Sequence, residues 1–136
     1  MWIGRTLFAL VLLTTVGLAS FVMGQDGFAG NKVISLIKVD LTGVANKQVI
    51  ANIYKVPAGA MVPRHFHHGD EFHLVLSGEW AAEVEGRPMH VMKAGDSQYV
   101  ERERWHGGKV VSDVPMRLLG LMIVDKDKPI LERVQD

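Results

Sequence analysis

The sequence predicts an all-β domain, and three observations support this. Short apolar runs recur after about residue 25, several of them alternating between apolar and polar side chains. Glycine, proline and aspartate cluster between these runs, as they do in turns. Helical periodicity is almost absent. We expect eight to ten short strands over residues 25–136, spaced as in β-sandwiches and barrels.

The strands are expected in the following order. Residues 49–56 are rich in β-branched side chains and end at the turn Pro57-Ala58-Gly59. Residues 79–85 place Trp80, Ala82 and Val84 on one face and three glutamates on the other, the alternation of a half-buried strand. A turn around Gly95 precedes a short strand at 97–100, and residues 116–124 form a last apolar strand before a charged tail.

Length and composition limit the possible functions. A chain of 136 residues with 48% apolar residues has material for one folded domain. Its 15 basic and 15 acidic residues cancel, so we expect no nucleic-acid partner. The chain contains no cysteine, which excludes disulfides and thiolate metal sites. Any metal must therefore be held by His, Asp or Glu.

The first 24 residues differ from the rest. Arg5 precedes an uncharged, leucine-rich run, and small residues follow near position 24, as in a signal peptide. The run is also long enough for an uncleaved membrane anchor. Both interpretations export the domain at 25–136 to the periplasm or the extracellular space. Membrane contact is expected only through this segment, if it is retained.

All six histidines fall between His65 and His106. The spacing of His65 and His67 sends both imidazoles to one face of a strand. Glu71 follows a Gly-Asp pair that permits a kink, and His106 precedes a glycine pair that lets the chain fold back. Three imidazoles and one carboxylate would hold a divalent metal with open positions. Histidines in apolar strands can also be core residues, and spacing alone does not decide between these alternatives.

The residues around these histidines resemble the cupin superfamily. Gly59, five residues, His65-x-His67, three residues, Glu71, six residues and Gly78 fill every defined position of the first cupin motif. In the second motif Gly95 and His106 match, whereas Glu101 and Glu103 replace a proline and a glycine, and Val110 replaces an asparagine. Without the proline at position 101 and the glycine at position 103, a differently shaped loop is expected around His106.

The resemblance implies a small jelly-roll β-barrel, the double-stranded β-helix, in a single-domain cupin with an export signal. It implies one divalent transition metal (Fe, Mn, Ni, Cu or Zn) held by His65, His67, Glu71 and His106. Glu71 would also accept a substrate proton. His73 shares the face of Glu71 and is a candidate for orienting a ligand or touching substrate, with packing as the alternative. Tyr99 and Trp105 are further substrate-binding candidates that could instead be core residues.

The resemblance suggests a metal-dependent oxygenase of the quercetin-dioxygenase-like kind, acting on a small organic molecule. Zinc or manganese in the same site would suit a lyase or an isomerase. A non-catalytic module that binds a metal or a small ligand is the remaining alternative.

Two surfaces carry further expectations. The charged loop 101–105 is either a solvated rim or an entrance that sorts polar substrates. Phe72, Leu74 and Leu76 are apolar on the strand face opposite Glu71, which favours a homodimer formed through a sheet surface.

Overall fold

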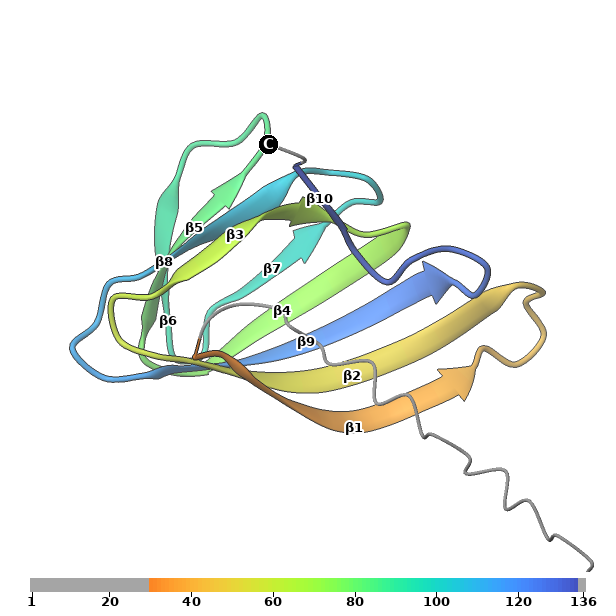
Figure 1. Ribbon diagram of the computed structural model, residues 1–136, viewed down its shortest axis with the longest axis horizontal. Helices are drawn as coiled ribbons and strands as arrows, with labels where there is room; N and C mark the ends of the chain where they lie inside the picture. Colours follow the sequence, from red (N-terminus) through yellow and green to blue (C-terminus); the bar gives the residue numbers. More distant parts are fainter. Residues whose placement is uncertain (1–29, 135–136) are drawn as a thin grey trace, which may run out of the picture.

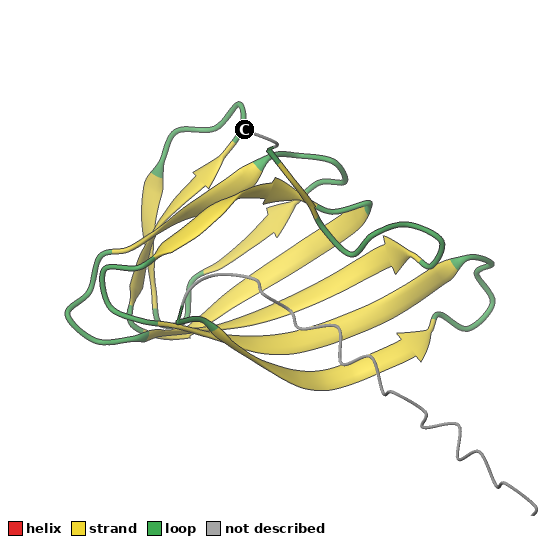
Figure 2. Ribbon diagram, in the orientation of Figure 1, coloured by secondary structure: helices red, strands yellow, loops and turns green. Residues whose placement is uncertain are grey.

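The computed structural model describes residues 30–134. Within that range it contains strands and loops and no helix, which confirms the all-β prediction (Figure 2). The predicted signal peptide or anchor at 1–24 lies outside the described residues. The strands are β1 (Lys32–Asp40), β2 (Lys47–Val56), β3 (Met61–Phe66), β4 (Gly69–Ser77), β5 (Glu79–Val84), β6 (His90–Lys93), β7 (Ser97–Val100), β8 (His106–Val110), β9 (Met116–Asp125) and β10 (Glu132–Arg133).

These strands form two antiparallel five-stranded sheets that face one another (Figure 1). Sheet A has the order β1-β2-β9-β4-β7, and sheet B has the order β10-β3-β8-β5-β6. Neighbours in each sheet are mostly distant in sequence, so the chain crosses repeatedly between the sheets, as in a jelly roll. The predicted strands at 49–56, 79–85, 97–100 and 116–124 correspond to β2, β5, β7 and β9.

The interior is filled by two groups of buried side chains. The larger group lies at one end and includes Val75, Trp80, Met92 and Met116, and the smaller consists of Ile50, Met122 and Val124. Strand alternation supplies these residues, because every second residue of β9 from Met116 to Val124 is buried. The four-residue group of histidines and glutamate described below is also buried between the sheets.

The side of sheet A that faces away from the interior is apolar. Its residues lie opposite one another in cross-strand rows, for example Ile34 with Ile53, Ile53 with Leu119, and Leu119 with Leu74. We call the following set the outer face of sheet A: Ile34, Ile37, Val39, Val49, Ala51, Ile53, Phe72, Leu74, Leu119, Leu121 and Ile123. Of this set, Ile37, Val39 and Phe72 are 46%, 54% and 44% exposed, whereas Ala51 is 4% exposed.

Candidate metal centre

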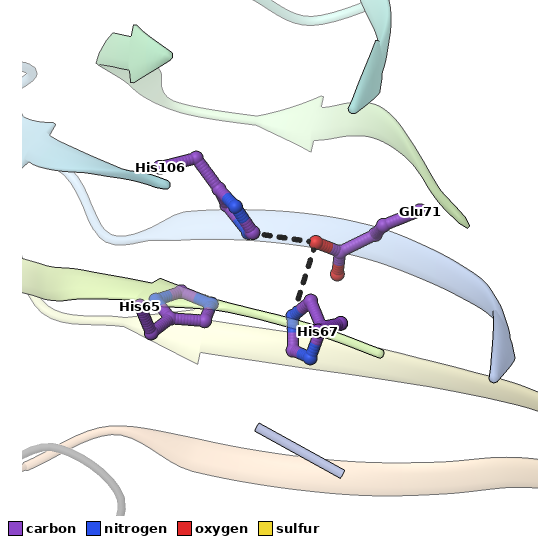
Figure 3. A group of neighbouring side chains, drawn as sticks. All are labelled: His65, His67, Glu71 and His106. Carbon is purple, nitrogen blue, oxygen red and sulfur yellow. Dashed lines mark ion pairs between the residues drawn. The ribbon is translucent and has the colours of Figure 1, made fainter. Parts of the chain in front are cut away.

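The two sheets together bring the four predicted metal ligands to one place. His65 on β3 lies directly opposite His106 on β8 in sheet B. His67 directly follows the end of β3, and Glu71 reaches the same point from β4 in sheet A (Figure 3). Pro63 falls in an irregularity of the β3–β8 pairing, where its missing N–H does not interrupt a regular ladder. Ligands more than 40 positions apart in the sequence thus meet in the interior.

The ligand atoms of His65, His67, Glu71 and His106 all lie within 4.8 Å of one another. Oε2 of Glu71 is 2.9 Å from Nε2 of His106 and 3.2 Å from Nε2 of His67. All four side chains are buried. The group therefore has the size and donor set of a single metal site.

In each of these histidines Nδ1 is bound to a backbone carbonyl oxygen, so Nε2 is the nitrogen that faces the centre. Nδ1 of His65 is 2.8 Å from the carbonyl oxygen of Pro63, Nδ1 of His67 is 2.6 Å from that of Ile130, and Nδ1 of His106 is 2.9 Å from that of Arg104. A carbonyl oxygen only accepts, so each Nδ1 donates its proton. In a neutral ring, Nε2 then presents a lone pair, which is the form that binds metals.

Without a cation this arrangement is unfavourable. Nε2 of His67, Nε2 of His106 and Oε2 of Glu71 are buried with no hydrogen-bond partner among the described residues. When both rings are neutral, these atoms face one another as lone-pair donors about 3 Å apart. A buried carboxylate that lacks a compensating charge costs several kcal/mol. A divalent cation bound by all four residues removes this cost, so the residues present fit a metal ion.

The pKa values follow from the same geometry. Burial lowers the pKa of His65 to about 3, helped by the nearby His106 and His67, so this ring is neutral. Burial alone would raise the pKa of Glu71, but His73 and His67 outweigh it and hold that pKa well below its usual range. Burial opposes the charge on His67, yet the carboxylate of Glu71 raises its pKa. The site therefore holds an anionic carboxylate that draws a cation.

A cavity of about 60 Å³ adjoins the four ligands. A water molecule needs roughly 10–15 Å³ of such space, so a few waters or the reacting end of a small molecule fit there. Apart from the four ligands, its walls are Asn31, Tyr54, Val56, Val62, His73, Trp80, Met116, Leu118 and Leu131. The ligands thus have a neighbouring space whose walls are largely apolar.

Sequence reasoning missed Tyr54 and Trp80 as wall residues. Burial, followed by the nearby charge of Glu71, raises the pKa of Tyr54, so its phenol keeps its proton. Nε1 of Trp80 is buried without a hydrogen-bond partner in the described chain. Alternation had assigned Trp80 to an inward face, but only the pairing of strands from both sheets identifies which inward residues border the cavity.

The three predicted substrate-binding residues have different positions. His73 lines the cavity and contacts Glu71, with Nε2 3.0 Å from Oε1. Tyr99 is 41% exposed, its hydroxyl donates to Asp70 over 2.9 Å, and its ring packs on Phe72 outside the barrel. The structure does not bring Tyr99 to the cavity, because its position on β7 points outward.

Trp105 is also not among the residues that line the metal-site cavity. Its ring packs edge-on against Phe66, with 4.8 Å between ring centroids, and the guanidinium of Arg64 lies over it. It borders a separate surface groove of about 380 Å³ near Arg64 and Arg87. His106 borders both spaces, so Trp105 is next to the metal ligand in sequence but faces a different space.

The loop before His106 keeps a left-handed turn although its expected glycine is replaced. Glu103 has φ 58°, and its N–H donates to the carbonyl of His67 over 2.9 Å. Its carboxylate lies 3.1 Å from Nδ1 of His68. The left-handed conformation at residue 103 is therefore present without a glycine. Arg87 and Glu101 pair over 2.5 Å at the protein surface, as in a charged rim.

Comparison with known proteins agrees with this site. The cupin domain model matches residues 52–124, more than half of the chain, so the chain belongs to the cupin family. No curated protein matches it.

Three solved structures illustrate the similarity of fold. The DMSP lyase DddQ from Ruegeria pomeroyi is 23% identical, with a TM-score of 0.63, covering 90% of this chain and 59% of that one. An uncharacterized Klebsiella pneumoniae protein with a double-stranded β-helix domain is 16% identical, with a TM-score of 0.60 and coverages of 78% and 85%. An oxalate oxidase in complex with glycolate is 19% identical, with a TM-score of 0.61 and coverages of 77% and 55%. These confirm the fold class.

Proposed function

We propose that this cupin is a metal-dependent oxygenase that acts on a small organic molecule. One observation carries the proposal: three Nε2 atoms and one carboxylate oxygen converge within 4.8 Å beside a small cavity. Four protein ligands leave coordination positions open on a six-coordinate ion. A redox-active divalent transition metal, when bound, supplies Lewis acidity and redox chemistry with O₂ at those positions.

The chain's own residues have separate roles in this proposal. The metal would be held by His65, His67, His106 and Glu71. Each of these side chains makes a further hydrogen bond, to a backbone carbonyl or to His73, which fixes its orientation toward the ion. The apolar wall formed by Val56, Met116 and Leu118 excludes water and favours a substrate with an apolar portion.

A lyase or isomerase is the second candidate, and Tyr54 supports it. Its protonated phenol lines the same cavity and can donate a hydrogen bond to a substrate oxygen near the metal ligands. A zinc or manganese ion would suffice for this chemistry, because no oxidant is needed. The likeness to a DMSP lyase is one of fold alone and does not favour this candidate over the first.

Metal analysis and O₂ uptake test the two candidates. We expect one divalent transition metal per purified wild-type chain, and none in a His65→Ala/His67→Ala variant.

Metal-free protein reloaded with Fe²⁺, Mn²⁺, Ni²⁺, Cu²⁺ or Zn²⁺ is then given flavonoid-like and diketone substrates. Substrate loss coupled to O₂ consumption supports the oxygenase. Substrate loss without O₂ consumption supports the lyase or isomerase. Failure of the wild type to bind any of these metals would contradict both, and metal binding without turnover would leave a binding module.

We further propose that the domain is exported. Support comes from the sequence of residues 1–24, which has the basic start, apolar run and small residues of a signal peptide. Within residues 30–134 no helix is long and apolar enough to cross a membrane. Mass spectrometry of the protein from fractionated cells decides the matter. We expect a chain that begins near Gln25 in the exported fraction, and a full-length chain in the cytoplasm would contradict export.

We also infer that the chain forms a homodimer through the outer face of sheet A. A contiguous apolar sheet surface of this kind is a site of protein association. Lys32, Lys55 and Arg117 lie side by side at one end of the face, and at the other end Asp125 pairs with Lys47 and Arg102. A second copy of the chain fits this face, because a two-fold axis pairs its apolar residues with the same residues of the partner.

A further inference from the structure

His73 is the fourth histidine of the buried group, and its contacts are the reverse of those made by the other three. It is 5% exposed and lies two residues after Glu71 on β4. Nε2 of His73 is 3.0 Å from Oε1 of Glu71, the carboxylate oxygen that does not face His67 and His106. Nδ1 of His73 meets the side-chain amide nitrogen of Gln98 at 3.0 Å, whereas Nδ1 of each metal-ligand histidine meets a carbonyl oxygen.

These partners determine the tautomer of His73. The carboxylate of Glu71 can only accept, so Nε2 of His73 must carry a proton to bond it. The amide nitrogen of Gln98 can only donate, so Nδ1 of His73 accepts. The imidazole of His73 is therefore held as the Nε2–H tautomer. The metal-ligand histidines are held in the opposite tautomer by backbone carbonyls.

Two neighbouring elements keep this pair in place. Gln98 on β7 lies directly opposite His73 on β4, so the sheet register brings their side chains together. The ring of Trp80 packs edge-on against the ring of His73 with 5.3 Å between their centroids. Beside them Gly120 leaves space chiefly for the ring of Tyr54, since a Cβ there would lie 2.7 Å from Cε2 of Tyr54 and 3.3 Å from Oε1 of Glu71.

We propose that Gln98 and His73 are positioning residues that make Glu71 a single-oxygen metal ligand. Oε1 accepts from the N–H of His73, whereas Oε2 is the oxygen that faces Nε2 of His67 and His106. A carboxylate with both oxygens free can bind a metal through both, which would use one more coordination position. The pair thus keeps a position open for substrate, and it withholds Oε1 of Glu71 from proton transfer. This inference rests on the proposed metal site.

Cobalt binding tests the effect on Glu71. Co²⁺ is titrated into metal-free wild type, His73→Phe, which loses the donor, and His73→Gln, whose amide nitrogen can reach a similar position. We expect His73→Phe to bind Co²⁺ about 10- to 100-fold more weakly. Its visible absorption spectrum should change, because the freed oxygen of Glu71 takes a coordination position that water or substrate would otherwise occupy. His73→Gln should restore the wild-type spectrum. A wild-type spectrum for His73→Phe, or no rescue by His73→Gln, would overturn the proposal.

The tautomer can be read without any metal. In ¹⁵N-histidine-labelled protein, two-bond ¹H–¹⁵N correlations distinguish the two tautomers of each ring. We expect the Nε2–H tautomer for wild-type His73 and a mixture in Gln98→Leu, which cannot donate to Nδ1. The Nδ1–H tautomer in the wild type, or an unchanged pattern in Gln98→Leu, would contradict the role of the pair. If the wild type binds no metal, the proposed function fails, and the tautomer pattern still decides whether Gln98 orients His73.

Discussion

Glu103 shows how a single residue maintains the loop that carries His106. A non-glycine residue with φ 58° is strained, because Cβ crowds the backbone in the left-handed region. The backbone N–H bond to the carbonyl of His67 ties this loop directly to a metal-ligand residue. The carboxylate of Glu103 adds contacts with His68 and Arg102, at 3.1 and 3.3 Å. These contacts help to hold the residue in a conformation that glycine would adopt freely.

A pair of substitutions isolates the strain at residue 103. Glu103→Gly and Glu103→Ala both remove the carboxylate, but only alanine keeps the Cβ that crowds the backbone. We expect the glycine variant to be more stable than the alanine variant by about 1 kcal/mol, measured by urea denaturation. Alanine normally stabilises relative to glycine through the unfolded chain, so an alanine variant of equal or greater stability would show that the turn is not left-handed in solution.

This residue also marks a limit of the sequence argument. The sequence predicted a changed loop because a glycine of the motif is replaced by Glu103. A motif records which residue is preferred at a position, but it does not determine which backbone conformation a different residue adopts there. The metal ligands were predicted because two of them share one strand face and the family motif supplies the others. Tyr99 and Trp105 were chosen for residue type alone. Their positions depend on which way β7 and the 101–105 loop face, which only the assembled sheets determine.

At the scale of elements, the carboxylate of Asp125 joins three segments. Asp125 is the last residue of β9. Its carboxylate pairs with Lys47 at the start of β2 and accepts a hydrogen bond of 2.6 Å from Arg102 in the loop before β8. Hydrogen bonds from Arg102 and then Lys47 lower the pKa of Asp125 to about 2. This carboxylate therefore contributes stability above the pKa of about 3.9 that it has when unfolded, and loses that contribution as pH falls toward 2.

The Asp125→Asn substitution tests this link through its pH dependence. We expect the wild type to be more stable than the variant at pH 7, and the difference to shrink between about pH 4 and pH 2, where the carboxylate becomes protonated. Chemical denaturation at several pH values measures the difference. A gap that stays constant over this range would mean that the charge of Asp125 contributes nothing.

The short strand β6 contributes to the core mainly through one side chain. Met92 is 1% exposed and packs in the larger buried group with Trp80, whereas Met89, just before the strand, is 63% exposed. We expect Met92→Ala to lower the free energy of unfolding by about 2–5 kcal/mol through lost burial and a cavity. Met89→Ala, the matched control, should change it by less than about 0.5 kcal/mol. Equal effects of the two substitutions in thermal or urea unfolding would contradict this account of the core.

For the whole molecule, the two sides of sheet A differ in the chemistry of their side chains. The inner side carries Glu71 and His73, and the outer side carries apolar residues on the same strands. Period-two alternation makes this division possible, because adjacent residues such as Glu71 and Phe72 point in opposite directions. Substitutions on the outer face should therefore change association while leaving the metal ligands in place.

Phe72→Glu tests the proposed dimer. Phe72 is 44% exposed on β4 of the outer face, and a buried, unpaired carboxylate there would oppose a two-fold contact twice. We expect sedimentation velocity to show a wild-type dimer and a Phe72→Glu monomer that still binds one metal ion. Val91→Glu places the same charge on β6 of sheet B at a residue that is 54% exposed, and should remain dimeric. A monomeric wild type, or a Phe72→Glu variant that sediments as a dimer, would exclude this face as the interface. Loss of both association and metal would instead indicate that the substitution had disturbed the fold of sheet A. In that case Leu76→Glu tests whether the charge itself prevents association, because Leu76 lies on the same side of β4 and is 37% exposed.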